Sequence, residues 1–311
     1  MPAPLDAGPD AARDRPAAIV VIVNSSAGTA AKRERIEVEL ADLFRAAGTR
    51  TEVVALERGQ DPTAVARDAS ARASIVVAAG GDGTVSSVAA AVVDSPAALG
   101  VLPLGSLNHF AKDLHIPLDL ADAIKVVAAG HIGHVDVGQV NDRVFVNNSS
   151  IGLYPSIVEE RESLRQRGHW KWPALALATL RVVRKYRGVT VGVDIDGRRQ
   201  TWRTPFVFIG NNEYDIDGPR VGGRTRLDQG TLVVYRAPRV HARDLPMLVA
   251  RALIGRRQAG DFEILPASEL WIDAGGAARL QVAIDGEVVS MRAPLHYRTR
   301  PKALRVVVPV R

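Results

Sequence analysis

The stretch Val76-Val77-Ala78-Ala79-Gly80-Gly81-Asp82-Gly83-Thr84 decides the fold of this chain. Four apolar residues, the pattern of a buried strand, end in three glycines that surround one aspartate. Apolar residues then recur at Val85, Val88 and Val92, the spacing of one buried helix face. A strand that turns through glycines into a helix directs several backbone N–H groups toward one point, which suits a phosphate group. The alternative is a turn whose glycines only supply unusual backbone angles.

Apolar runs around this stretch alternate with helical patterns. One helical pattern ends at Gly48, a usual place for a left-handed cap, and another begins at Asp61-Pro62, a capping acid followed by proline. This alternation predicts a parallel sheet with helices on both faces. The strands that we expect in it are residues 19–23, 51–56, 74–79 and 99–103.

After Gly130 the chain changes to short strands with antiparallel connections. Asn141-Asp142 and Asp196-Gly197 each separate two apolar or alternating runs, and such pairs are typical of hairpin turns. Residues 303–310 have the pattern of a strand that either half could hold. The predicted fold is therefore an α/β half followed by a β-rich half. Further strands are expected at 205–210, 231–236, 270–273 and 280–284, and helices near 156–167 and 172–187.

Composition excludes several classes of protein. The 311 residues include no cysteine, so disulfides, thiol nucleophiles and cysteine metal sites are absent. Residues 1–15 are rich in Ala, Pro and Asp, and we expect a disordered tail without a secretory signal. No run approaches the roughly 18 apolar residues that a membrane span requires. These features predict a cytoplasmic protein of one large or two modest domains.

The net charge of +6 suits nucleic acid, an anionic membrane surface or a phosphorylated substrate. Nucleic acid is not expected as a partner, because the chain lacks a helix-turn-helix, a zinc pattern and an array of stacking aromatic residues. The sequence leaves a homodimer open.

Three loops follow predicted parallel strands and so meet at one edge of the sheet, the usual ligand side of such folds. None has the spacing of a Walker loop or the G-x-G-x-x-G pattern. Three such loops together predict a nucleotide cleft. The candidate nucleotide-binding residues are Asn24, Ser25 and Gly28 in the first loop, Gly80, Gly81, Asp82, Gly83 and Thr84 in the second, and Gly105, Ser106 and Asn108 in the third.

These loops, with Asp228-Gln229-Gly230-Thr231-Leu232 and Asp285-Gly286-Glu287, resemble the diacylglycerol kinase catalytic-domain family, which includes bacterial lipid kinases and sphingosine kinases. The motifs follow the family's order over nearly the whole chain from Pro16. The resemblance implies ATP- and Mg²⁺-dependent phosphorylation of a lipid hydroxyl, diacylglycerol-like or sphingoid- or ceramide-like. It also implies an α/β nucleotide domain, residues 16–132 and 297–311, and an antiparallel β-sandwich-like lipid domain, residues 133–296, with the active site between them.

The resemblance to bacterial lipid kinases implies that Asp285 is the general base and that Glu287 supports it or the metal. Asp82 is the alternative base, because sphingosine kinases are thought to use the aspartate of the glycine loop. Asp285-Gly286 also fits an ordinary type I′ hairpin turn. Asp228 is implied as a ligand of a structural Mg²⁺, although Gln229 stands where the family has a second acid.

One departure from the family's motif bears on which lipid is the acceptor, and one basic segment bears on how the lipid is reached. His109 stands where most members of the family carry an aspartate, which puts a direct transfer of diacylglycerol specificity in doubt. Trp170 and Trp172 lie in a basic surround, and both residue types favour an anionic membrane surface. We therefore expect transient association with the inner face of the membrane, or a role in the lipid pocket. A core helix with a charged outer face is the alternative.

Two other functions compete. An NAD kinase-like enzyme with a soluble acceptor has similar glycine loops, but residues 103–108 lack the Gly-x-Leu-Gly-Phe pattern of that family. A non-catalytic nucleotide- or lipid-binding regulator is disfavoured, because Asp82, Asp285 and Glu287 are all present.

Overall fold

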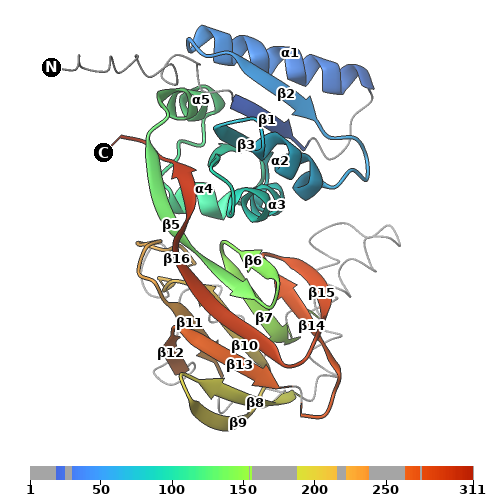
Figure 1. Ribbon diagram of the computed structural model, residues 1–311, viewed down its shortest axis with the longest axis vertical. Helices are drawn as coiled ribbons and strands as arrows, with labels where there is room; N and C mark the ends of the chain where they lie inside the picture. The colour runs from blue at the N-terminus through green and yellow to red at the C-terminus, as the bar shows by residue number, and fades with distance from the viewer. Residues whose placement is uncertain are drawn as a thin grey trace, which may run out of the picture.

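The computed structural model of the chain (Figure 1) describes residues 19–24, 30–153, 155, 188–215, 222–237, 263–273 and 275–310. The predicted tail, residues 1–15, lies outside the described residues. So do both helices predicted near 156–167 and 172–187, together with Trp170 and Trp172.

Four parallel strands form the first part of a large sheet. β1 (Ile19–Val23) lies between β2 (Thr51–Ala55) and β3 (Ile75–Gly80), and β4 (Ala98–Pro103) pairs with the other edge of β3. Every residue of β1, β3 and β4 is buried. Strands covered on both faces need apolar residues at every position, which is why these segments are continuous apolar runs. The predicted parallel sheet is confirmed.

Helices cover this sheet, α1 packing with α5 and α2 with α3 (Figure 1). The predicted helix boundaries are confirmed at two places. Gly48, at φ +79°, follows α1, and the Asp61 carboxylate accepts a hydrogen bond from the N–H of Thr63 at 2.9 Å where α2 begins. The five helices of the described residues are α1 (Ala30–Ala46), α2 (Pro62–Ser70), α3 (Asp82–Val92), α4 (His109–Asp113) and α5 (Leu120–Ala129). None of them has the length and hydrophobicity that crossing a membrane requires.

The second half of the chain is antiparallel, as predicted. A separate six-stranded sheet has the order β12-β11-β10-β7-β14-β15, and four other strands extend the first sheet in the order β16-β13-β8-β9. Both predicted hairpins are present, β5–β6 at Asn141 and β8–β9 at Asp196. The strands are β5 (Ile132–Val140), β6 (Arg143–Phe145), β7 (Asn148–Gly152), β8 (Val189–Ile195), β9 (Arg198–Thr204), β10 (Phe206–Asn211), β11 (Leu232–Arg236), β12 (Glu263–Ala267), β13 (Glu269–Asp273), β14 (Arg279–Ile284), β15 (Glu287–Arg292) and β16 (Leu295–Val307).

β16 runs through both halves of the molecule (Figure 1). Val306 pairs in parallel with Leu99 of β4, whereas the rest of the strand pairs with β5 and β13 in antiparallel register. The register with β5 shifts between Arg300 and Leu304. The strand is therefore longer than the predicted 303–310 and belongs to both halves.

Two hydrophobic cores lie on either side of this crossing. The first is mostly aliphatic and gathers β1–β4, the helices and the end of β16. The second lies between the antiparallel strands and includes Trp202, Phe145 and Tyr297. The predicted domain boundaries, after residue 132 and before residue 297, remain a prediction, because strands β5 and β16 continue across both positions.

Candidate active site

The glycine loop joins β3 to α3 as a short turn. β3 ends at Gly80, and Gly81 is the N-cap of α3 with extended backbone and no side chain to bond the helix. The N–H groups of Thr84 and Val85 donate to the carbonyl of Gly81 at 2.9 and 3.1 Å. The N–H groups of Asp82 and Gly83 belong to the first helical turn, where the helix itself offers no acceptor. The turn thus presents donors and the positive end of the helix dipole to an anion.

The loop after β4 packs directly on this turn. The N–H of Leu104 donates to the carbonyl of Gly80 at 3.1 Å. A Cβ atom on Gly105 would lie 2.5 Å from the Cα of Gly81, so the two loops touch through their backbones. Asn108, buried and at φ +52°, closes the loop, since its side chain bonds both the N–H and the carbonyl of Gly105. The Asn108 side chain therefore shapes the loop, while Ser106 is exposed.

Asn24 joins the first loop to the glycine loop. Its side-chain amide donates to the Thr84 hydroxyl at 3.1 Å, and its backbone N–H donates to the carbonyl of Ala79 at 3.0 Å. Ser25 and Gly28 lie outside the described residues. The structure thus brings residues of all three predicted loops together at the carboxyl ends of β1, β3 and β4. Their role in binding a nucleotide remains a prediction.

Asp82 and His109 lie on neighbouring helices at this edge. Asp82, the first residue of α3, is partly buried, and its carboxylate accepts the N–H of Phe110 at 3.3 Å. His109 is the first residue of α4, and it is exposed.

Asp285 forms the predicted hairpin turn between β14 and β15, with φ +45° followed by Gly286 at φ +90°. Its carboxylate points back into the molecule. One oxygen accepts the N–H groups of Asn147 and Asn148 at 2.8 and 3.0 Å. The other accepts the N–H of Val146 at 2.9 Å and the Ser86 hydroxyl of α3. Asp285 therefore has a structural role in the turn, and its role as a base remains a prediction.

Burial raises the pKa of the Asp285 carboxyl, while the hydrogen bonds from Ser86 and from the three backbone N–H groups lower it, with a net upward shift. Ser86 lies four residues after Asp82 on α3, so the two side chains lie on the same helix face. Asp285 thus contacts α3 about one helical turn after Asp82 of the glycine loop. Glu287, by contrast, is exposed at the start of β15.

Asp228 lies beside an arginine of its own segment. It accepts a hydrogen bond from Arg226 Nε at 3.0 Å, and this contact lowers the pKa of the carboxyl. The neighbouring Gln229 uses its side-chain oxygen to accept the N–H of Glu213 at 3.4 Å. Within the part of the chain that the structure describes, no three His, Asp or Glu side chains gather as a metal site. A metal role for Asp228 remains a prediction.

Sequence reasoning missed one buried charged residue beside the site, Arg224. Its side chain is fully buried and forms an ion pair with Asp113 of α4, with Nε 2.8 Å from Oδ2. The guanidinium also lies 5.3 Å from the centre of the Tyr214 ring. A lone arginine after Gly222-Gly223 carries no sequence pattern that would have identified it.

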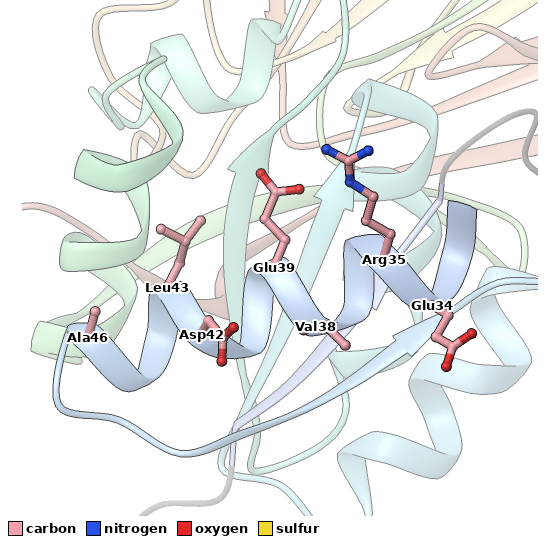
Figure 2. Close-up of a pocket in the computed structure, with 7 residues that line it drawn as sticks. All are labelled: Glu34, Arg35, Val38, Glu39, Asp42, Leu43 and Ala46. Carbon is pink, nitrogen blue, oxygen red and sulfur yellow. The ribbon is translucent and has the colours of Figure 1, made fainter. Parts of the chain in front are cut away.

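A pocket on the outside of the molecule lies along α1 (Figure 2). Its residues all come from that helix, and none is a predicted site residue. The pocket is therefore separate from the glycine loops. It is lined by Glu34, Arg35, Val38, Glu39, Asp42, Leu43 and Ala46.

Both halves of the chain are similar to domains of known proteins. Residues 18–140 match the diacylglycerol kinase catalytic domain, and residues 158–308 match the YegS C-terminal NAD kinase beta sandwich-like domain. A diacylglycerol kinase of Staphylococcus aureus (strain bovine RF122 / ET3-1) is 26% identical over 273 residues, which are 86% of this chain and 85% of that protein. A diacylglycerol kinase of Staphylococcus saprophyticus is 33% identical over 146 residues, which are 46% of this chain and 48% of that protein.

Solved structures share the fold. A crystal structure of a diacylglycerol kinase from Bacillus anthracis str. Sterne aligns with a TM-score of 0.67 at 17% identity and covers 94% of this chain and 97% of its own. A second structure from that organism, provisionally assigned the same activity, aligns with a TM-score of 0.74 at 21% identity over 94% and 95%. The two family models together match most of the chain, which therefore belongs to the diacylglycerol kinase catalytic-domain family.

Proposed function

We propose that this chain is an ATP-dependent lipid kinase that transfers the γ-phosphoryl group of ATP to a lipid hydroxyl. Homology to lipid kinases of the diacylglycerol kinase family supports a kinase. The observation that carries the proposal is the backbone contact between Gly81 and Gly105 at the N-terminus of α3. Two loops that touch without side chains leave room for a phosphate chain to approach backbone donors.

The donors at this turn fit ATP and Mg²⁺. The N–H groups of Asp82 and Gly83 would hold phosphate oxygens, and a Cβ on Gly83 would meet open space, so the turn is accessible there. Asp82 would provide a carboxylate for Mg²⁺, which commonly uses one or two protein carboxylates together with phosphate oxygens. When bound, ATP supplies the phosphoryl group, and the metal neutralises charge that develops during transfer.

Asp285 is the proposed general base. Its four donors occupy the usual lone-pair positions of a carboxylate, so a substrate hydroxyl must displace one of them. The Ser86 hydroxyl is the one side-chain donor of the four, and a rotation of its side chain would free Oδ2. The lipid hydroxyl would then donate to Oδ2 and transfer its proton there as its oxygen attacks the γ-phosphorus, while the bond between that phosphorus and the bridging oxygen breaks and ADP leaves. Asp82 remains the alternative base, because it lies within the glycine loop.

The acceptor is proposed as a lipid alcohol, diacylglycerol-like or sphingoid- or ceramide-like. This proposal includes transient association with an anionic membrane surface on the cytoplasmic side. Trp170 and Trp172, the residues predicted to contact the membrane, lie outside the described residues, so this part rests on the sequence alone.

The test is transfer of label from γ-labelled ATP to a panel of lipid alcohols, with NAD⁺ included as a soluble acceptor. Wild-type protein should label a lipid, and Asp285→Asn should lower the rate about 10²–10⁴-fold, the usual contribution of a general base. Asp196→Asn is the matched control, because Asp196-Gly197 is another hairpin turn with a positive φ and a hydrogen-bonded carboxylate. Asp82→Asn distinguishes the two candidate bases. Label on NAD⁺ alone, or on nothing, would refute the lipid kinase proposal.

A further inference from the structure

We infer that Arg224 is a positioning residue that fixes the catalytic distance between the glycine loop and Asp285. This inference rests on the proposed function, because it assigns Arg224 an effect on the same reaction. Arg224 touches neither loop directly. It acts through the two segments that hold Asp82 and Asp285 in place.

The contacts of Arg224 span several elements of the fold. Its Nε and its backbone N–H bond the two carboxylate oxygens of Asp113 in α4, at 2.8 and 3.0 Å. Its Nη1 donates to the carbonyls of Val146 and Asn211, at 2.7 and 2.9 Å. Its Nη2 donates to the side-chain oxygen of Asn147 at 2.7 Å. Only the planar, five-donor guanidinium can make this set at once, since a lysine offers a single ammonium group.

One side of this network leads to the glycine loop. Asp113 lies in α4, three residues after Phe110, whose N–H donates to the Asp82 carboxylate. α4 follows directly on Asn108, which closes the loop that packs on Gly81. Because Arg224 holds Asp113, it fixes the short helix that contacts Asp82.

The other side leads to Asp285. Val146 and Asn147, which accept hydrogen bonds from Arg224, direct their own N–H groups at the Asp285 carboxylate. Three successive N–H groups form a concave anion site whose direction depends on the orientation of the peptide planes. Arg224 holds the carbonyl side of the first of these residues and the side chain of the second. A continuous path therefore connects the two candidate catalytic carboxylates through one arginine.

A buried ion pair is costly to desolvate, and it is often replaceable by apolar residues without loss of stability. The position of Arg224 is therefore better explained by orientation than by stability. Tyr214 supports this orientation, because its ring lies under the guanidinium and its hydroxyl accepts the side-chain amide of Asn148.

The first experiment compares Arg224→Lys with Arg236→Lys. Arg236 is the matched control, since it also pairs with a carboxylate, Glu263 at 2.7 Å, and lies over an aromatic ring, Trp202 at 4.3 Å, but it belongs to β11. Arg224→Lys should lower kcat on the order of 10²-fold, as a displacement of about 1 Å can, while KM for ATP stays within about threefold. Arg236→Lys should leave both constants within about threefold. A folded Arg224→Lys protein with a kcat within about twofold of wild type would overturn the inference.

Asp113→Asn gives a second test, and it decides the matter if Arg224→Lys does not fold. It keeps the size of the side chain but weakens the bond to Arg224. It should therefore also lower kcat, while KM for ATP changes much less. The double variant should be about as active as the less active of the two single variants, because both substitutions act through one network. Multiplied effects would show that Arg224 and Asp113 act separately and would overturn the path.

Hydrogen exchange separates failure of this inference from failure of the proposed function. The N–H groups of Val146, Asn147 and Asn148 bond Asp285. They should exchange at least tenfold faster in Arg224→Lys than in wild type, whichever acceptor the enzyme uses. A wild-type protein without lipid kinase activity would refute the proposed function, yet faster exchange at these three positions would still support the coupling. Unchanged exchange would overturn it.

Discussion

Asp285 has two roles: it shapes the β14–β15 turn, and its carboxylate is the proposed general base. The left-handed backbone at φ +45° is accessible to aspartate, and the inward carboxylate is enclosed by four donors. Burial raises its pKa above the ordinary value of 3.8, and its hydrogen bonds oppose that shift. A base near neutrality is more effective than one of ordinary acidity, so the shift is in the direction that the proposed role needs.

The pH dependence of activity follows from this balance. Since the base acts in its ionised form, a raised pKa places the acidic limb of kcat/KM above pH 3.8. Ser86→Ala removes a donor that lowers the pKa, so the limb should move to higher pH. Ser87→Ala is the control, because its hydroxyl donates to the carbonyl of Gly83 and does not contact Asp285. A limb that Ser86→Ala leaves in place would mean that another group titrates.

Sequence alone could identify Asp285 but could not describe its surroundings. Its partners are Ser86 and residues 146–148, more than 130 positions away in the chain. A local pattern predicts the turn, and only the resemblance to the family distinguishes a turn from a catalytic residue. Arg224 was missed for the same reason, since its partners come from α4, β10 and the segment before β7.

The contact between the β3–α3 and β4–α4 loops is set by two glycines. A Cβ at Gly105 would lie 2.5 Å from the Cα of Gly81 and 2.8 Å from Oδ1 of Asn108, and backbone cannot yield as a flexible side chain does. Gly105→Ala should therefore separate the loops, cost about 1–3 kcal/mol of stability and weaken ATP binding. Gly192→Ala is the control, because its Cβ would make an ordinary 3.5 Å contact in β8. Thermal unfolding and ATP titration measure both effects, and ATP affinity equal to that of wild type in Gly105→Ala would contradict the predicted cradle.

Strands were predictable where burial dictates the composition. β1, β3 and β4 are apolar at every position, because both faces are covered. β7 was missed, since it buries Ser149 and Ser150 in the middle of a sheet, where Ser149 bonds the Tyr297 hydroxyl at 3.0 Å. β12 was missed because it contains Pro266, which an edge strand tolerates. Polar pairs and edge positions depend on neighbours that a local pattern does not contain.

At the scale of the whole molecule, β16 joins strands of both halves in one ten-stranded sheet. It continues the parallel strands through β4 and the antiparallel strands through β5 and β13. A second buried link lies beside its bulge. The Asp136 carboxylate, 1% exposed as a residue, accepts the N–H of Gly230 at 2.6 Å and that of Lys302 at 2.7 Å. Unfolding one half would expose these bonds and the shared strand.

We therefore expect a single cooperative unfolding transition. All four tryptophans lie after residue 169, so their fluorescence reports on the second half of the chain. The described helices α1–α5 all end before residue 130, so they dominate the far-ultraviolet circular dichroism of the first half. Midpoints from the two probes in urea should coincide, as two-state unfolding requires.

The buried Asp136 link gives this expectation a sharper form. Asp136→Ala leaves the N–H groups of Gly230 and Lys302 without their acceptor, and it should lower both midpoints together, at a total cost of about 1–3 kcal/mol. Glu39→Ala, an exposed position on α1, should change stability by no more than about 0.5 kcal/mol. If Asp136→Ala lowers the fluorescence midpoint and leaves the dichroism midpoint unchanged, the halves unfold independently. In that case the shared strand does not couple them, and the glycine loop and Asp285 are held together by the Ser86 hydrogen bond and the Arg224 network.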